Sequence, residues 1–428
     1  MSSVKQNPGL YKIVVTHYVV AAFCFLILSV MMLFSVNAFT GHYFHPQILA
    51  ITHLAALGWG TMIILGASYQ LIPVVLETEL YSEKLAWVSF GFFLPGLLEL
   101  VYSFWVFVPG IHMQCGAVLL MLAVILFTLN VYLTGRKKKQ QTIQEDFIFS
   151  ACLCLCFTVA LGTALVFNFT ISIFAQDHLH FLKLHAHLGL IGWFLLMLIG
   201  VSSKLVPMFL VSSYQKTGLL NASYYLIVIA LLLFLADSYF FGLNFRTYVI
   251  FAIGAAGISC YFMFILKCLR SRLRKHIDLP MLSSFLSFIL LKIAILTVPF
   301  IIYFHLKNSP ATVRFSMIYG EFMLLGWITA LILGQTFKTL PFIVWVKRYE
   351  HLTGKFKTPM PADLYVNNLL KAQTISFIIF CLAFMPGCYF MTIPLIYIGV
   401  AALMVTAILY ITNVFIVLFH KTITYGKL

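Results

Sequence analysis

Histidine is the residue type through which this sequence most directly suggests chemistry, because several histidines fall inside long apolar segments. An ionisable side chain within a membrane is costly, so its presence there predicts a specific role. His53 and His187 each lie about six residues into an apolar segment, or roughly 9 Å deep along a helix. His185 precedes His187 by two residues. Since two residues turn a helix by about 200°, these two rings are expected to face different neighbours.

Two imidazoles at matched depth on neighbouring helices suit a haem with two axial histidines, one on each side of the ring plane. We therefore interpret His53 and His187 as candidate haem ligands. The sequence contains 42 phenylalanines, which are enough to line such a pocket. The alternative, in which each histidine is only a hydrogen-bonded polar group, stays open.

A second group of candidate metal ligands precedes the same segment. His178 and His180 extend the pattern to His-x-His-x4-His-x-His, and imidazole is a good ligand for copper and related metals. A solvated loop near the membrane surface is the alternative. Cys152, Cys154 and Cys156 alternate by two along a helix, which splays their thiols and gives poor geometry for one metal site.

Membrane helices must position these residues. Of the 428 residues, 62% are hydrophobic and 9% are charged, a ratio that excludes an ordinary soluble protein. Apolar runs of about 20 residues, the length that crosses a bilayer, predict an all-α integral membrane protein. The first helix lacks a small-residue cleavage site, so we expect it to remain as a membrane helix. The twelve expected helices lie near 11–37, 47–76, 85–108, 112–134, 147–174, 181–210, 218–241, 247–269, 280–305, 314–344, 369–391 and 395–419.

The formal net charge of +15 does not indicate nucleic-acid binding, because the basic residues gather in loops on one side of the membrane. The positive-inside rule predicts an inner (cytoplasmic) membrane protein with these loops and both termini in the cytoplasm. Contact with anionic membrane lipid is a secondary role for the same loops. The loop residues are Arg136, Lys137, Lys138, Lys139, Arg270, Arg272, Arg274, Lys275, Lys347, Arg348, Lys355 and Lys357, against Lys183, Arg246, Lys307 and Arg314 on the opposite side.

The second, sixth and tenth helices share a pattern with a period of 134 residues. This predicts three four-helix repeats, about 1–143, 144–277 and 278–428, within a single membrane domain. The repeated glycines allow close approach either of another helix or of a flat ligand, and the sequence favours neither. The pattern is His53, Gly58, Trp59, Gly66 and Pro73, then His187, Gly192, Trp193, Gly200 and Pro207, then Glu321, Gly326, Trp327, Gly334 and Pro341.

Other ionisable residues also fall within the predicted helices. Glu99, Asp237 and Glu321 would either relay protons or face a metal, or be protonated and hydrogen-bonded. Lys204 and Lys338 occupy equivalent positions near the inner ends of two repeats. We expect these lysines to extend toward the cytoplasmic interface.

The stretch from His185 through Trp193 to Pro207 resembles the tenth helix of the catalytic subunit of heme-copper oxidases, and the C-type oxidases are the best match. That family has twelve helices in three four-helix arcs with pseudo-threefold symmetry. Its His-x-His motif carries one ligand for each of two haems. The resemblance implies a low-spin haem, b-type, held by His53 and His187, and a high-spin haem on His185.

The sequence departs from the family pattern at the metal sites. The His-x-His motif falls in the sixth helix, whereas the tenth carries Tyr319 and Glu321. The family's copper site uses an adjacent His-His pair, which this sequence lacks, so the copper site looks incomplete. Arg246 and Arg314 suit either haem propionates or interface anchoring.

The resemblance implies a membrane redox protein that carries electrons to an acceptor such as O2 or NO, as a terminal oxidase or nitric oxide reductase does. Cytochrome c or a quinol would be the donor, and further membrane subunits would be partners. The sequence has no C-x-x-C-H motif, so a cytochrome donor would be another chain. Two alternatives stay open, namely a twelve-helix transporter with its site at a repeat interface and a haem sensor or assembly factor with the oxidase fold.

Overall fold

The computed structural model describes residues 8–137, 141–422 and 425–427, so Lys138 and Lys139 lie outside the described residues. Twelve helical spans in the described chain are long and apolar enough to cross a bilayer. The chain is therefore an all-α, multi-pass membrane protein, which confirms the prediction from composition. The spans are Leu10–Phe34, Pro46–Leu76, Glu83–Val106, Ile111–Gly135, Ile143–Asn168, His178–Leu210, Gly218–Phe240, Arg246–Arg270, Leu279–Leu306, Ala311–Leu352, Asn367–Tyr389 and Ile393–Leu418.

Short irregular helices interrupt or follow some of these spans, and two short strands, β1 (Phe356–Lys357) and β2 (Tyr425–Lys427), pair in antiparallel fashion. The helices are α1 (Pro8–Phe34), η1 (Val36–Thr40), α2 (Pro46–His53), η2 (Leu54–Thr61), α3 (Met62–Leu76), α4 (Glu83–Val106), α5 (Ile111–Gly135), α6 (Ile143–Asn168), α7 (His178–His187), η3 (Leu188–Leu195), α8 (Leu196–Leu210), α9 (Gly218–Phe240), α10 (Arg246–Arg270), α11 (Leu279–Leu306), α12 (Ala311–Glu321), η4 (Phe322–Ile328), α13 (Thr329–Tyr349), η5 (Glu350–Leu352), η6 (Pro361–Leu364), α14 (Asn367–Tyr389) and α15 (Ile393–Leu418).

Three π-helical segments recur with the period of the sequence repeat. They are η2, η3 and η4, and they begin at residues 54, 188 and 322, immediately after His53, His187 and Glu321. A π-helical turn widens the helix by one residue and is often found at functional sites. The 134-residue spacing found in the sequence therefore also separates the π-helical segments of these three helices.

The ends of the repeated helices are alike in two copies and different in the third. Glu77 and Val211, which are also 134 residues apart, have φ of 54° and 49° and end α3 and α8. This left-handed conformation is a common helix terminator. At the corresponding position, α13 continues through Trp345 to Tyr349, and the Trp345 indole donates to the Pro359 carbonyl at 2.6 Å. The third helix is thus longer than the predicted 314–344.

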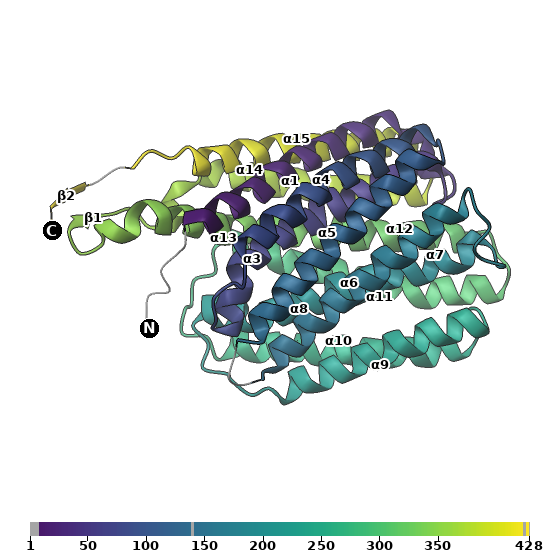
Figure 1. Cartoon of the computed structure of the whole chain (residues 1–428), viewed down its shortest axis with the longest axis horizontal. Helices are drawn as coiled ribbons and strands as arrows, with labels where there is room; N and C mark the ends of the chain where they lie inside the picture. The colour runs from purple at the N-terminus through teal and green to yellow at the C-terminus, as the bar shows by residue number, and fades with distance from the viewer. Residues whose placement is uncertain (1–7, 138–140, 423–424, 428) are drawn as a thin grey trace. The chain divides into compact units, whose positions relative to one another are not determined.

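The first compact unit comprises Met1–Ser68, Ile277–Ala294 and Val313–Leu428. Within this unit α14 and α15 form an antiparallel hairpin, and α1 runs beside α15 (Figure 1). An aromatic cluster fills the core. Trp59 of η2 stacks on Phe25 of α1 with ring centroids 4.3 Å apart, and Tyr410 of α15 meets Trp59 edge-on at 5.1 Å.

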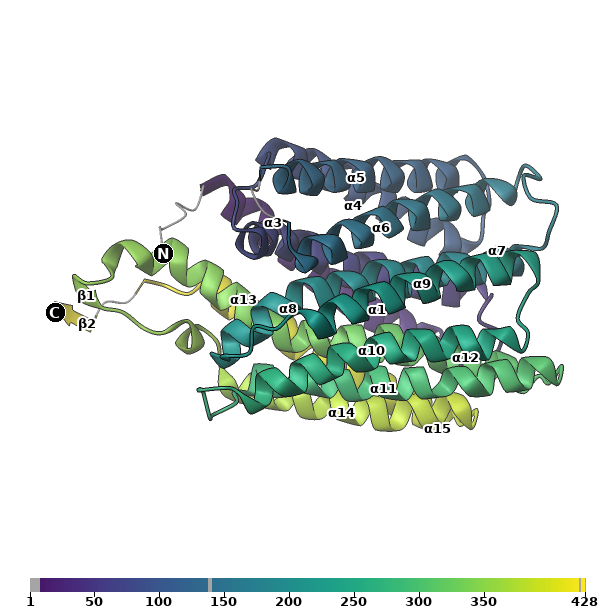
Figure 2. The same cartoon turned by 90° about the horizontal axis from the view of Figure 1, so that it is seen from below.

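The second compact unit comprises Tyr69–His276 and Ile295–Thr312. In this unit α4 pairs with α5, α9 pairs with α10, and α6 packs against both α5 and α8 (Figure 2). Gly96 of α4 and Gly116 of α5 allow close approach, because a Cβ at Gly96 would lie 2.9 Å from the Gly116 carbonyl oxygen. Helices within a bilayer gain little from the hydrophobic effect when they associate, because lipid is also apolar. Small residues let them approach closely and gain van der Waals contact instead.

Candidate functional site

His53 is the last residue of α2, directly before η2, and its side chain is half-buried. Its ring nitrogen Nδ1 donates a hydrogen bond to the Leu49 carbonyl at 2.7 Å. A carbonyl only accepts, so Nδ1 carries the proton in the neutral ring and Nε2 carries the lone pair. His53 is therefore held in the tautomer that ligates a metal through Nε2.

His187 has the same local geometry in the second compact unit. It is the last residue of α7, directly before η3, and its Nδ1 donates to the Lys183 carbonyl at 2.8 Å. The Phe234 ring of α9 lies against it, with centroids 4.5 Å apart. His187 and His53 thus share their position before a π-helical segment, their partner four residues earlier and their tautomer.

His185 faces a different helix, as the two-residue spacing predicts. Its Nδ1 donates to the Thr158 carbonyl of α6 at 2.9 Å. The ring also lies against Gly162, where a Cβ would come within 2.8 Å of the His185 Cε1 atom. The ring of His187 instead contacts α9 through Phe234. Gly162 could not be predicted from the His-x-His motif, because it lies on the preceding helix, α6.

These three histidines meet the chemical requirement for haem-iron ligands. A ligating histidine normally donates its other ring N–H to a carbonyl or carboxylate, which fixes the ring and increases its basicity. Each of His53, His185 and His187 makes this bond to a backbone carbonyl. The donor set therefore fits haem, with each ring already oriented by a backbone carbonyl.

The repeated glycines contact helices rather than an open pocket. A Cβ at Gly66 would lie 2.4 Å from the His17 Cβ of α1, and one at Gly192 would lie 2.6 Å from the Cys154 Cβ of α6. In the third copy, a Cβ at Gly334 would lie 2.5 Å from the Pro280 carbonyl oxygen of α11. Of the two interpretations left open by the sequence, these contacts support helix packing.

His178 and His180 lie in the first turn of α7. Nδ1 of His178 lies 3.1 Å from the Asn168 side-chain nitrogen, and its Nε2 lies 3.0 Å from the Leu165 carbonyl. Both nitrogens of His178 thus have hydrogen-bond partners at the end of α6. The His180 ring packs edge-on against Tyr239 at 5.9 Å. Over the described residues, no group of three or more His, Cys, Asp or Glu is arranged to hold a metal ion.

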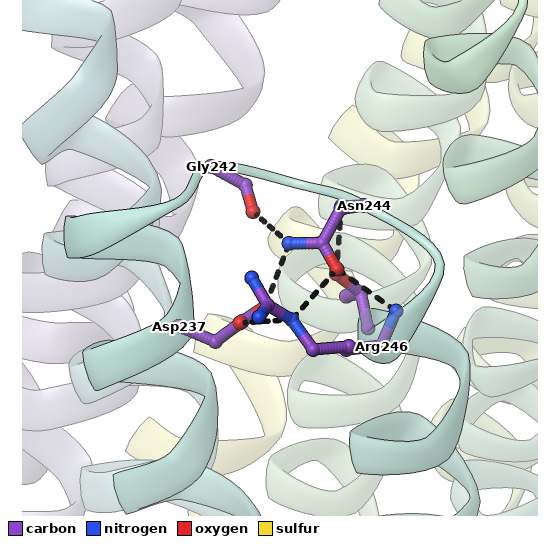
Figure 3. Close-up of polar contacts among 5 residues, drawn as sticks. Asp237, Gly242, Asn244 and Arg246 are labelled. Atoms are coloured by element: carbon purple, nitrogen blue, oxygen red, sulfur yellow. Dashed lines mark hydrogen bonds and ion pairs between the residues drawn. The ribbon is translucent and has the colours of Figure 1, made fainter.

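Several charged residues near helix ends form ion pairs. Figure 3 shows the best-developed one, in which Arg246 Nε lies 3.0 Å from Asp237 Oδ1. Asn244 also donates to Asp237 at 3.1 Å and to the Gly242 carbonyl at 2.8 Å. This network closes the loop between α9 and α10, so Asp237 and Arg246 have a structural role there.

The two repeat-equivalent lysines, Lys204 and Lys338, each form an ion pair with a carboxylate. The expectation that they extend toward the cytoplasmic interface did not include these pairs. Lys204 lies 2.9 Å from Glu77, and Lys338 pairs with Asp278. Glu99 lies 3.4 Å from Nδ1 of His112 on an exposed surface. Glu321, in contrast, is only 6% exposed.

Comparison with known proteins identifies the fold. No protein-family description matches the chain, and no curated protein matches it. The chain is similar in structure to a heme-copper terminal oxidase that was solved as a dimer, with a TM-score of 0.65 and 12% sequence identity over 98% of this chain and 85% of that one. The chain therefore shares the fold of that heme-copper terminal oxidase.

Proposed function

We propose that this chain is a haem-binding membrane redox protein in which His53 and His187 are the two axial ligands of one low-spin haem, b-type. The observation that carries the proposal is the local geometry shared by these two residues. Each precedes a π-helical segment, the two are 134 residues apart, and each donates Nδ1–H to the carbonyl four residues earlier. The oxidase-like fold supports the same conclusion.

The protein's own residues would hold and orient the group. The Leu49 and Lys183 carbonyls fix the rings of His53 and His187, and Phe234 restricts the movement of the His187 ring. His185, fixed by the Thr158 carbonyl, would be the ligand of a second, high-spin haem. When bound, haem supplies reversible one-electron chemistry.

The wider proposal is that electrons pass from cytochrome c or a quinol to an acceptor such as O2 or NO, and that further membrane subunits bind the chain. Because the sequence lacks a His-His pair, copper is left out of the proposal. We also propose three four-helix repeats, 1–143, 144–277 and 278–428, in pseudo-threefold arrangement, with both termini cytoplasmic. The recurring π-helical segments support the repeats, and the basic loops support the orientation.

A reduced-minus-oxidised absorption spectrum of the purified, haem-supplemented protein tests the proposal. We expect a low-spin b-type signal, and a carbon monoxide difference signal that His185→Ala removes. His112→Ala, which changes an exposed histidine paired with Glu99, is the matched control and should leave both signals unchanged. A folded protein that stays colourless would contradict the redox proposal and favour a transporter. A haem signal without reaction with O2 or NO would instead favour a sensor or assembly factor.

A further inference from the structure

Glu321 occupies, in the third repeated helix, the position that His53 and His187 occupy in the other two. It is the last residue of α12 and directly precedes η4. Its side chain is only 6% exposed. The same backbone environment thus presents a carboxyl group where the first two copies present an imidazole.

The surroundings of Glu321 are poor in groups that would stabilise a negative charge. Neither carboxyl oxygen has a hydrogen-bond partner of normal geometry among the described residues. Cys388, a buried residue of α14, is the polar side chain with which the carboxyl interacts. The ion pairs found in the described part of the chain involve other carboxylates. An uncompensated buried charge is strongly unfavourable, so the group is neutral and carries a proton.

A metal ion fits this position less well than a proton does. Protein metal sites for borderline and hard cations normally use three or more protein ligands. In the parts of the chain that the structure describes, Glu321 and Cys388 belong to no group of that size. Each of these side chains has one exchangeable proton, so the ligand that suits the pair is the proton.

Several buried polar groups lie along α13 between Lys338 and η4. Lys338 pairs with Asp278, and the Gln335 amide donates to the Ser284 hydroxyl at 2.7 Å. Further along the helix, Thr329 donates to the Leu324 carbonyl at 3.0 Å, inside η4. These are polar groups along α13 between the Lys338–Asp278 pair and the segment that follows Glu321.

We propose that Glu321 is a proton-binding site of this chain, with Cys388 as its polar neighbour. The carboxylate takes a proton from a hydronium ion, which leaves as water, and the reverse step returns it. The site goes beyond the proposed haem ligation and does not require haem to be bound.

Infrared spectroscopy of the purified protein without added haem tests the proposal. At neutral pH we expect a carbonyl stretch of a non-hydrated carboxylic acid that disappears in Glu321→Gln. Transfer to D2O should shift this band downward, because the proton exchanges with water. Cys388→Ala should shift the band in the opposite direction by removing the polar side chain beside the carboxyl group, which a purely structural role would not predict.

Glu99→Gln is the matched control, because Glu99 is a membrane-helix carboxylate that is partly exposed and paired, and it should leave the band unchanged. Absence of the acid band at neutral pH in wild type would overturn the proposal, as would a band that does not shift in D2O. Replacement of the acid band by carboxylate bands on addition of Zn²⁺ alone would overturn it in favour of a metal site. If Glu321→Gln does not fold, the D2O shift in wild type and the Cys388→Ala shift still decide the question.

Discussion

At the scale of single residues, backbone carbonyls decide which ring nitrogen of each candidate ligand is available to a metal. His53 and His187 use carbonyls of their own helices, whereas His185 uses the Thr158 carbonyl of α6. The sequence was sufficient to predict the first two residues as a related pair, because their spacing equals the repeat. It was not sufficient to predict the partner of His185, because that carbonyl lies 27 residues away on another helix.

Gly162→Ala should displace the His185 ring. The added Cβ would lie 2.8 Å from Cε1 of that ring, too close for the present orientation. We expect the carbon monoxide signal assigned to His185 to fall at least about tenfold, which corresponds to about 1.4 kcal/mol, while the low-spin signal persists. Gly189→Ala is the matched control, since its Cβ would meet Thr158 Cγ2 at an ordinary 3.4 Å. Equal loss of both signals in Gly162→Ala would contradict this role for the glycine.

At the scale of helices, Gly66 sets how closely α3 approaches α1. A Cβ there would lie 2.4 Å from the His17 Cβ, so Gly66→Ala forces one of the helices to shift. We expect a loss of about 1–3 kcal/mol in the free energy of unfolding, measured by thermal denaturation in detergent. Gly91→Ala should have almost no effect, because nothing lies within 4 Å of its added Cβ. Similar thermal stabilities for the two variants would show that this contact is not required.

Asn168 ends α6 and shapes the loop that follows. Its side-chain oxygen accepts from the backbone N–H groups of Ile173 at 2.8 Å and Phe174 at 2.9 Å. Asn168→Ala removes both hydrogen bonds and should lower the free energy of unfolding by about 1–3 kcal/mol. Hydrogen–deuterium exchange should become faster only in the loop. Asn221→Ala, at an exposed site on α9, should change neither quantity. Unchanged exchange in Asn168→Ala would rule out the capping role.

The segment after α15 should respond to pH. His420 Nε2 lies 2.8 Å from the Tyr349 hydroxyl, and burial together with the nearby Arg348 guanidinium lowers the pKa of His420 below its ordinary value of 6.5. The folded segment therefore binds fewer protons than the unfolded one, so this stability is present above pH 6.5 and is lost as the pH falls below it. Protection from hydrogen–deuterium exchange around His420, measured relative to the intrinsic exchange rate at each pH, should fall on acidification in wild type but not in His420→Phe. Equal loss of protection in both proteins would assign the effect to another group.

The length and number of helices could be predicted from apolar runs, but their local irregularities could not. The predicted helix 147–174 ends instead at Asn168, whose capping role depends on the path of the following loop. The π-helical segments depend on which carbonyl each N–H selects, and hydrophobic pattern does not encode that choice. Within the π-helical segments, the sequence showed only that the Gly58-Trp59 pair recurs at Gly192-Trp193 and Gly326-Trp327.

At the scale of the whole molecule, the basic loops predict one orientation in the membrane. A fluorescent reporter that matures only in the cytoplasm should give signal when fused at the C-terminus. A phosphatase that is active only outside the cytoplasm should be active when fused after Gln176, in the loop between α6 and α7. The reverse pattern would contradict the positive-inside interpretation. Fusion after Ser213, between α8 and α9, is the control and should behave as the C-terminus does.

The most direct test of the central claim, that His53 and His187 hold one haem together, is the haem content per chain. We expect His53→Ala and His187→Ala each to lose the same single low-spin haem, and the double variant to lose no more than either, because a bis-histidine site fails when one ligand is removed. His112→Ala should retain the wild-type content. If the two single variants lose different haems, or if the losses add in the double variant, the two histidines do not share a haem and the account is contradicted.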